Sequence, residues 1–153
     1  MVGAGGWFAA RDWTHQGSRV MHILRHYSNA WDGTTARIIG AAIEVHRALG
    51  PGLLESAHRI CLAEELSLRG LEFRREIPLP VQYRGRTLDS AYRIDFVVEG
   101  VVVELKAVEQ VLPVHRAQVQ TYLRLTNLRC GLLLNFNVPV LKDGVTRMIH
   151  TLQ

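Results

Sequence analysis

The chain has 153 residues, of which 48% are hydrophobic, and this is enough for one domain with a core of ordinary size. Its formal net charge of +4 permits contact with nucleic-acid phosphates but does not establish it. The longest uninterrupted apolar stretches, such as residues 131–134, are far shorter than the roughly 20 residues that a membrane-spanning helix needs. Composition therefore excludes a protein that crosses the membrane as helices.

The cysteines and the N-terminal sequence indicate the compartment. Cys61 and Cys130 stand singly in apolar runs, without CxxC spacing or histidines at zinc-ligand offsets, so we expect both to be small buried hydrophobic residues. The first residues, MVGAGGWFAARDW, lack the basic and apolar regions of a secretory signal. These features predict a cytoplasmic protein. Residues 1–33 show neither helical nor alternating periodicity, which predicts a poorly ordered extension before a domain at 34–153.

Two helices are predicted before any strand. Apolar residues recur at helical spacing from Thr34 onwards, and Asp32 or Thr34 is available as the N-cap. The Gly50-Pro51-Gly52 segment interrupts this helix. A second helical pattern follows from Leu54 and ends at Gly70, in the position that glycine favours after a helix C-terminus.

Extended segments come next. Residues 72–77 and 79–83 are predicted to be two short strands separated by Pro78 and followed by a turn at 84–86. In residues 92–108, alternating apolar positions flank Glu99-Gly100, and this pattern indicates a β-hairpin.

The C-terminal third predicts one more helix and two more strands. The helix covers 114–126, directly after Pro113. The apolar run 130–136 is typical of a buried strand, and 145–152 can form an edge strand after a turn at 142–144. The whole order predicts an α/β domain.

The predicted hairpin brings two carboxylates together. If Glu99 and Gly100 are the two central turn residues, Asp95 lies directly across from Glu104, with Cβ atoms about 5 Å apart. Like charges so close destabilise a sheet, unless a cation lies between them. A divalent cation such as Mg²⁺, which needs only one or two protein carboxylates, is the natural occupant.

Lys106 completes this predicted cluster. It lies two residues beyond Glu104 and therefore on the same face of the strand. An ammonium group there could orient an attacking water and offset the charge that builds on a phosphate. The alternative interpretation is that these charged residues simply cover a solvated face of the sheet.

Other polar residues are candidates for the same site. Gln118 and Tyr122 are four residues apart on the third helix and share a face, although a half-buried tyrosine beside a surface glutamine would give the same pattern. Glu55 lies in the first turn of the second helix, where the helix dipole favours a carboxylate regardless of function. His58, one turn later, is more typical of a packing residue than of a ligand.

These motifs resemble those of a known superfamily. Asp95, Glu104-Leu105-Lys106 and Gln118-Val-Gln-Thr-Tyr122 resemble the D, ExK and QxxxY motifs of RecB-like PD-(D/E)XK nucleases. The run Leu49-Gly-Pro-Gly-Leu-Leu-Glu55 and the later Leu-Leu-Asn-Phe-Asn are similar, more narrowly, to the GxxExxY family of small nucleases. Gly52 and Glu55 match that signature, whereas His58 holds its tyrosine position.

The resemblance implies a restriction-endonuclease-like αβββαβ core, with a mixed central sheet flanked by helices. It also implies Mg²⁺ or Mn²⁺ as the cofactor and nucleic acid, most simply DNA, as the substrate. Asp95 and Glu104, with Glu55 as an additional acid, would hold the metal. Lys106 would assist the attacking water, and Gln118 with Tyr122 would position the strand.

Two alternatives belong to other functional classes. The first is a binding module that has kept the nuclease fold and grips nucleic acid or a protein without cutting; the small size of the chain, with no second domain to select a substrate, favours it. The second is a complex-forming subunit whose apolar helices mediate a homodimer or contact a protein partner.

Overall fold

The computed structural model describes residues 31–151, without the side chains of Trp31, Asp32 and Ser90. The predicted N-terminal extension lies, up to residue 30, outside the described residues. The elements of the described chain, in order, are α2 (Trp31–Leu49), α3 (Glu55–Leu68), β1 (Phe73–Tyr83), β2 (Arg86–Val98), β3 (Val101–Lys106), α4 (Pro113–Thr126), β4 (Cys130–Asn135), the 3₁₀ helix η1 (Leu141–Gly144) and β5 (Val145–Ile149).

The strands form one mixed sheet in the order β1-β2-β3-β4-β5. Neighbouring strands run antiparallel except β3 and β4, which are parallel and joined by the crossover helix α4. The predicted mixed sheet flanked by helices is therefore confirmed, and its element order is consistent with a restriction-endonuclease-like fold.

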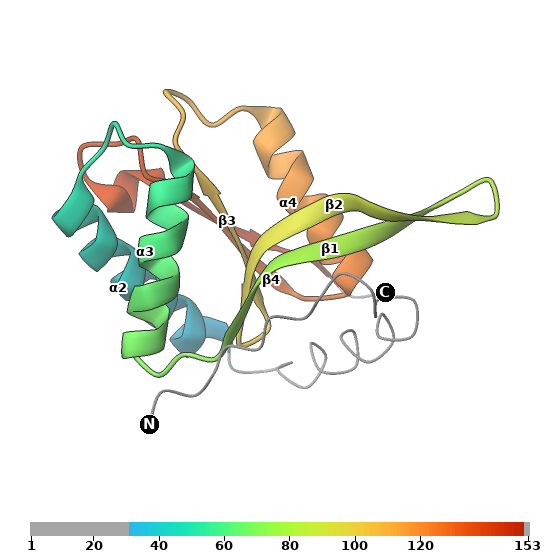
Figure 1. Cartoon of the computed structure of the whole chain (residues 1–153), viewed down its shortest axis with the longest axis horizontal. Coiled ribbons are helices and arrows are strands. Elements are labelled where there is room, and N and C mark those ends of the chain that lie inside the picture. The colour runs from blue at the N-terminus through green and yellow to red at the C-terminus, as the bar shows by residue number, and fades with distance from the viewer. Residues whose placement is uncertain (1–30, 152–153) are drawn as a thin grey trace.

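Helices cover both faces of this sheet (Figure 1). Helices α2 and α3 pack on one face, around a core that includes Ile38, Leu62 and Leu132. Helix α4 packs on the other face, where Val119 and Leu123 meet a second cluster of buried residues. The strands β3 and β4 are buried between the two helical layers, which explains their almost continuous apolar sequences.

Two helices start earlier than predicted, α2 by three residues and α4 by one. Helix α2 begins at Trp31, so neither Asp32 nor Thr34 is its N-cap. Helix α4 begins at Pro113 itself, since proline is well suited to a first helical turn, where its missing N–H group costs nothing. Helix α3 ends at Leu68, and Gly70 follows in the left-handed conformation as expected.

The two strands predicted on either side of Pro78 are in fact one strand, β1. A proline is tolerated there because β1 lies at the edge of the sheet, where one side of the strand needs no backbone partner. Strand β2 is also longer than predicted, because it begins at Arg86 rather than near Tyr92. As a result β1 and β2 form a long hairpin whose far end projects from the sheet (Figure 1).

The hairpin of β2 and β3 has the predicted register. Val98 pairs with Val101 and Phe96 with Val103, across a two-residue turn. The turn residues Glu99 and Gly100 have φ angles of 44° and 83°, which both lie in the left-handed region that this tight turn requires.

The remaining predictions hold with adjusted bounds. The buried strand ends at Asn135, and the edge strand covers Val145–Ile149. The turn predicted before it is the 3₁₀ helix η1. Cys130 is buried as expected, whereas Cys61 is only half-buried. Among the residues that the structure describes, no helix is long and apolar enough to span a membrane.

Candidate metal centre

The candidate site lies where β2 and β3 separate. Their backbone ladder ends with the pair of Phe96 and Val103, one position before Asp95 and Glu104 would meet. Instead of continuing the ladder, the Asp95 carboxylate accepts a hydrogen bond from the backbone N–H of Leu105 at 2.9 Å. This bond fixes the Asp95 side chain beside the segment that carries Glu104, so the two predicted ligands are brought together.

Glu104 is buried with incomplete hydrogen bonding. The residue is 3% exposed, and its Oε1 atom lies 3.4 Å from the Lys106 ammonium. Its Oε2 atom has no hydrogen-bond partner among the described residues. A buried carboxylate oxygen without a partner is costly, and this cost indicates that the site is built to receive a positively charged group.

The protonation behaviour of the two acids reflects their burial. Burial, followed by the nearby charge of Asp95, raises the pKa of Glu104 from 4.5 to about 8, although Lys106 opposes this shift. Burial also raises the pKa of Asp95, against the hydrogen bond from Leu105 and the charge of Arg59. Glu104 therefore resists ionisation while Asp95 is charged, whereas the pKa of Asp95 is raised by its burial and by the charge of Glu55.

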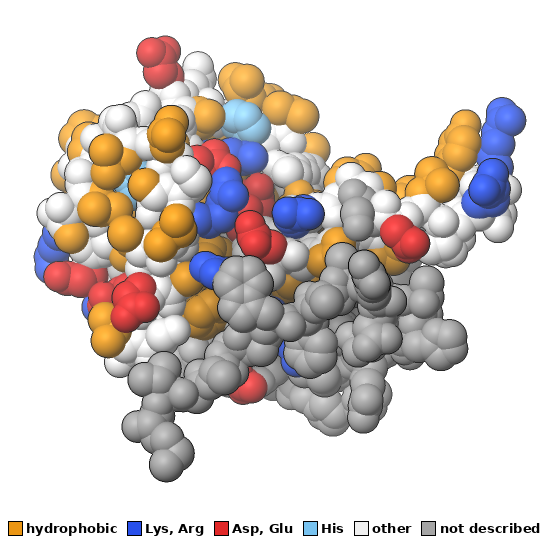
Figure 2. Space-filling view, viewed as in Figure 1, with side chains coloured by type: hydrophobic (Ala, Val, Ile, Leu, Met, Phe, Trp, Pro, Cys, Tyr) orange, Lys and Arg blue, Asp and Glu red, His pale blue; other side chains and the backbone are white. Residues whose placement is uncertain are grey.

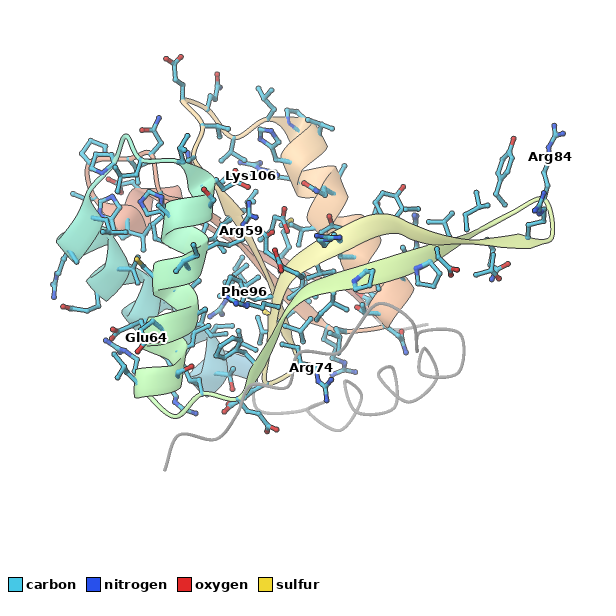
Figure 3. All side chains as sticks on the ribbon, in the orientation of Figure 1. Arg59, Glu64, Arg74, Arg84, Phe96 and Lys106 are labelled. Carbon is cyan, nitrogen blue, oxygen red and sulfur yellow. The ribbon has the colours of Figure 1, made fainter. Side chains whose placement is uncertain are left out.

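Arg59, which was not predicted, contributes a cation to this cluster. From α3, its guanidinium forms an ion pair with Glu55 at 2.8 Å and another with Asp95 at 3.4 Å. Burial alone would lower the pKa of Arg59, but the charges of Asp95 and Glu55 outweigh burial and raise it. Figure 3 shows Arg59 in the same region as Phe96 and Lys106, between α3 and the sheet.

Glu55 therefore lies near Asp95, but its carboxylate pairs with Arg59. Its carboxylate binds Arg59, and its charge reaches Asp95 and disfavours the ionised form of that residue. The predicted role of Glu55 as a third metal ligand is not tested by this arrangement. Within residues 31–151, no group of three or more His, Cys, Asp or Glu side chains is arranged to hold a metal ion.

Gln118 and Tyr122 share a face of α4, as predicted, and lie beside the same acids. The Gln118 amide donates a hydrogen bond to the Tyr122 hydroxyl at 2.8 Å, and this hydroxyl donates to the backbone carbonyl of Arg93 at 2.9 Å. Burial, and then the charge of Glu104, raise the pKa of Tyr122 to about 12. The pair thus anchors β2 two residues before Asp95.

Asn135 belongs to the Leu-Leu-Asn-Phe-Asn segment, but the sequence analysis gave it no role in the site. Its side-chain amide donates to the carbonyl of Val108 at 2.9 Å and accepts from the N–H of the same residue at 3.1 Å. The backbone N–H of Phe136 also donates to the carbonyl of Lys106 at 2.8 Å. These bonds hold the end of β3 in place, and with it the backbone of Lys106.

His58 packs rather than entering the carboxylate cluster. Its ring stacks on Phe136 with centroids 4.5 Å apart, and its Nε2 atom donates to the carbonyl of Gly50 at 3.1 Å. The His58 ring is fully buried. The interpretation of His58 as a packing residue agrees with these contacts.

The donor set suits a hard divalent cation. Mg²⁺ prefers oxygen ligands, and one or two protein carboxylates are enough, since waters and a phosphate complete its octahedron. Asp95 and Glu104 would supply these carboxylates, and the unpartnered Oε2 of Glu104 would gain the positive partner that it lacks. Figure 2 shows acidic and basic side chains gathered between α3 and the base of the β1–β2 hairpin.

Comparison with protein families gave one result that covers most of the chain. The family model described as the PD-(D/E)XK nuclease superfamily matches residues 32–148. Comparisons with curated proteins and with solved structures found no match. The matched region begins at the second residue of α2 and ends at Met148, the last residue but one of β5.

A pH dependence of stability follows from the buried Glu104. In EDTA, the folded chain keeps a proton on Glu104 up to about pH 8, whereas the unfolded chain releases it near pH 4.5. Stability must therefore fall as pH rises between these values, and Glu104→Gln should remove the part of this fall that Glu104 causes. In urea unfolding, the stability of the variant relative to that of the unmodified protein should increase by roughly 4 kcal/mol from about pH 5 to about pH 9.

The control for this measurement is Glu109→Gln, since Glu109 is exposed and changes the net charge equally. The control should keep the pH dependence of the unmodified protein. If Glu104→Gln and the unmodified protein gave parallel curves of stability against pH, the burial argument for Glu104 would be wrong.

Arg59 should compete with a divalent cation for the same carboxylates. Replacing it with glutamine leaves Glu55 and Asp95 without their cation, so the metal-free protein should lose stability and gain more from Mg²⁺. Thermal unfolding with and without Mg²⁺ measures this gain. Arg69→Gln is the matched control, because Arg69 pairs with Glu65 at the same 2.8 Å at the other end of the same helix.

The increase of melting temperature caused by Mg²⁺ should be larger in Arg59→Gln than in the unmodified protein, and unchanged in Arg69→Gln. An equal increase in all three proteins would mean that Arg59 and the metal do not share a site.

Proposed function

Since the chain belongs to the PD-(D/E)XK nuclease superfamily, we propose that it is a metal-dependent nuclease that hydrolyses the phosphodiester bonds of DNA. The ion would be Mg²⁺ or Mn²⁺. One observation carries the proposal: the buried Glu104, with an unpartnered Oε2 atom, lies beside Asp95 and contacts Lys106 at the point where two strands separate. A sheet face that merely needed solubility would not bury these charges.

Each residue has a proposed role that fits its contacts. Asp95 and Glu104 hold the metal, with Glu55 joining them once Arg59 releases it. When bound, the ion would polarise the phosphate and favour ionisation of the attacking water. Lys106 places a positive charge next to Glu104, where it orients this water and offsets charge developing on the phosphate.

Gln118 and Tyr122 position the DNA strand in this proposal. Their hydrogen bonds to each other and to the backbone of Arg93 keep their polar groups beside Glu104. Asn135 acts more remotely, as a positioning residue for the end of β3.

We also propose that the chain belongs, more narrowly, to the GxxExxY nucleases. The support is Gly52 and Glu55 at the signature positions, with Gly52 in a left-handed conformation (φ 87°) that favours glycine. His58 stands at the tyrosine position of this signature and stacks on Phe136. The cytoplasmic location stays a prediction from the sequence.

A binding module without catalysis is the second candidate. The observation that favours it is the pairing of Arg59 with both Glu55 and Asp95, because a tethered cation that stays in place would neutralise the acids without any metal. Such a protein would bind DNA in a salt-dependent manner, unaffected by EDTA, and would not cut at any concentration of Mg²⁺ or Mn²⁺.

A cleavage assay tests the proposed function. The purified protein, titrated with Mg²⁺ and Mn²⁺, should cut a mixture of single- and double-stranded DNA, and EDTA should abolish cutting. Lys106→Gln should lower the rate at saturating Mg²⁺ by about 100-fold or more, as removal of one charge-stabilising donor does in other enzymes. Glu104→Gln should lose both cutting and stabilisation by the metal.

The control is Arg129→Gln, which removes an exposed positive charge just before β4, at the end of the parallel β3–β4 pair opposite to Lys106. It should cut at the rate of the unmodified protein. Equal rates for Lys106→Gln and the unmodified protein would contradict the assigned roles, and no cutting by the unmodified protein would favour the binding module.

A further inference from the structure

The outer part of the β1–β2 hairpin, residues 81–88, forms an arm that stands apart from the sheet (Figure 1). A register shift between Leu79 and Val81 separates it from the base of the hairpin. Every residue from 82 to 89 is exposed. The arm therefore contributes little to the core, and its sequence needs an explanation outside folding.

The tip of the arm is built as an ordered ribbon. Arg84 and Gly85, with φ angles of 50° and 74°, form the tight turn whose twist matches that of antiparallel strands. The Gln82 amide donates to the Thr87 hydroxyl across the strands at 2.6 Å. The Arg84 guanidinium lies over the Tyr83 ring, 5.7 Å from its centroid. These contacts stiffen the ribbon before any partner binds.

The surface of the arm combines aromatic and apolar groups with positive charge. Tyr83 is 59% exposed and Leu88 44%, whereas Tyr92 lies at the base of the hairpin and packs edge-on against Tyr122. Arg84 and Arg86 lie beside Tyr83 at the tip, where Figure 2 shows basic side chains at the far end of the hairpin and Figure 3 labels Arg84. Exposed large apolar side chains next to arginines are typical of a surface that contacts another macromolecule.

We propose that the β1–β2 arm enters the major groove of B-form DNA and so makes double-stranded DNA the substrate. This inference rests on the proposed nuclease function, because it names the substrate of the same site. The major groove, about 12 Å wide, admits a two-stranded β-ribbon, and arginines suit both phosphates and guanine edges. The major groove of A-form RNA is too narrow for such an element.

The length of β2 relates the arm to the site. Arg86 and Asp95 are nine positions apart on this strand, which corresponds to roughly 30 Å. Along a duplex, this distance is about nine base pairs. If one phosphate of the DNA lies at Asp95, the duplex reaches the tip of the arm only when it continues for about one helical turn beyond that phosphate.

A second copy of the chain fits the arm less well. Two sheets that join edge to edge need free backbone donors, and β1, the edge strand, carries proline at positions 78 and 80. These prolines lack the N–H group that strand addition would use. The positive charge at the tip also suits a polyanion better than an identical tip.

Binding in EDTA tests this inference without cleavage. Fluorescence anisotropy would compare the unmodified protein with the double variant Arg84→Gln/Arg86→Gln on a 24-base-pair DNA duplex and on a hairpin-closed 8-base-pair duplex. The variant should bind the long duplex about tenfold more weakly near 0.15 M salt, with a salt slope smaller by about 2. On the short duplex the two proteins should bind equally.

The matched control is Arg124→Gln/Arg129→Gln, which removes two exposed charges outside the arm and should keep the salt slope. Circular dichroism and sedimentation would verify folding and oligomeric state. Equal binding of the long duplex by arm variant and unmodified protein would overturn the proposal. So would an equal loss on the short duplex or on double-stranded RNA, or a change of oligomeric state alone, which would identify a second copy as the partner.

This test separates the two proposals. Loss of binding in the arm variant, together with no cutting by the unmodified protein, would support the arm and reject the nuclease. Cutting of DNA by the unmodified protein, together with normal DNA binding by the arm variant, would support the nuclease and reject the role of the arm.

Discussion

The burial of two neighbouring carboxylates, Asp95 and Glu104, is the constraint on which the organisation of this site depends. Removing such groups from water is expensive, and the charge of Asp95 makes ionisation of Glu104 harder still. The fold compensates with positive groups on both sides, Arg59 from α3 and Lys106 from β3. The compensation is incomplete, because Oε2 of Glu104 has no partner in the described part of the chain. A divalent cation is the simplest group that would complete it.

Hydrogen bonds from the surrounding strands and from α4 hold the two acids close together although their charges repel each other. The N–H of Leu105 fixes Asp95 where the β2–β3 ladder ends, and the Tyr122 hydroxyl bonds to the backbone of β2 from the opposite helical layer. Asn135 holds the segment after Lys106 by two hydrogen bonds to one residue. Bonds from three separate elements thus hold Asp95, the backbone of β2 and the segment after β3, so the acids are placed by the fold and not by their own charges.

Much of this arrangement could be predicted from the sequence, because local rules fix it. A two-residue turn at Glu99-Gly100 sets the hairpin register, and alternation along a strand puts Lys106 beside Glu104. Arg59 was missed because its spacing from Glu55 is that of an ordinary surface ion pair on a helix, and only the packing of α3 on the sheet brings it to Asp95. The continuity of β1 through its prolines was missed because the sequence does not identify an edge strand.

The central claim is that these two carboxylates bind a divalent cation in exchange for the contact with Arg59, and a crystal soaked in Mn²⁺ tests it most directly. The anomalous difference map should contain a peak about 2 Å from oxygens of Asp95 and Glu104, with the Arg59 guanidinium moved away from Asp95. The same soak of Asp95→Asn crystals should lack it. A map without a peak at this position, at a concentration of Mn²⁺ that alters the protein's stability, would contradict the claim.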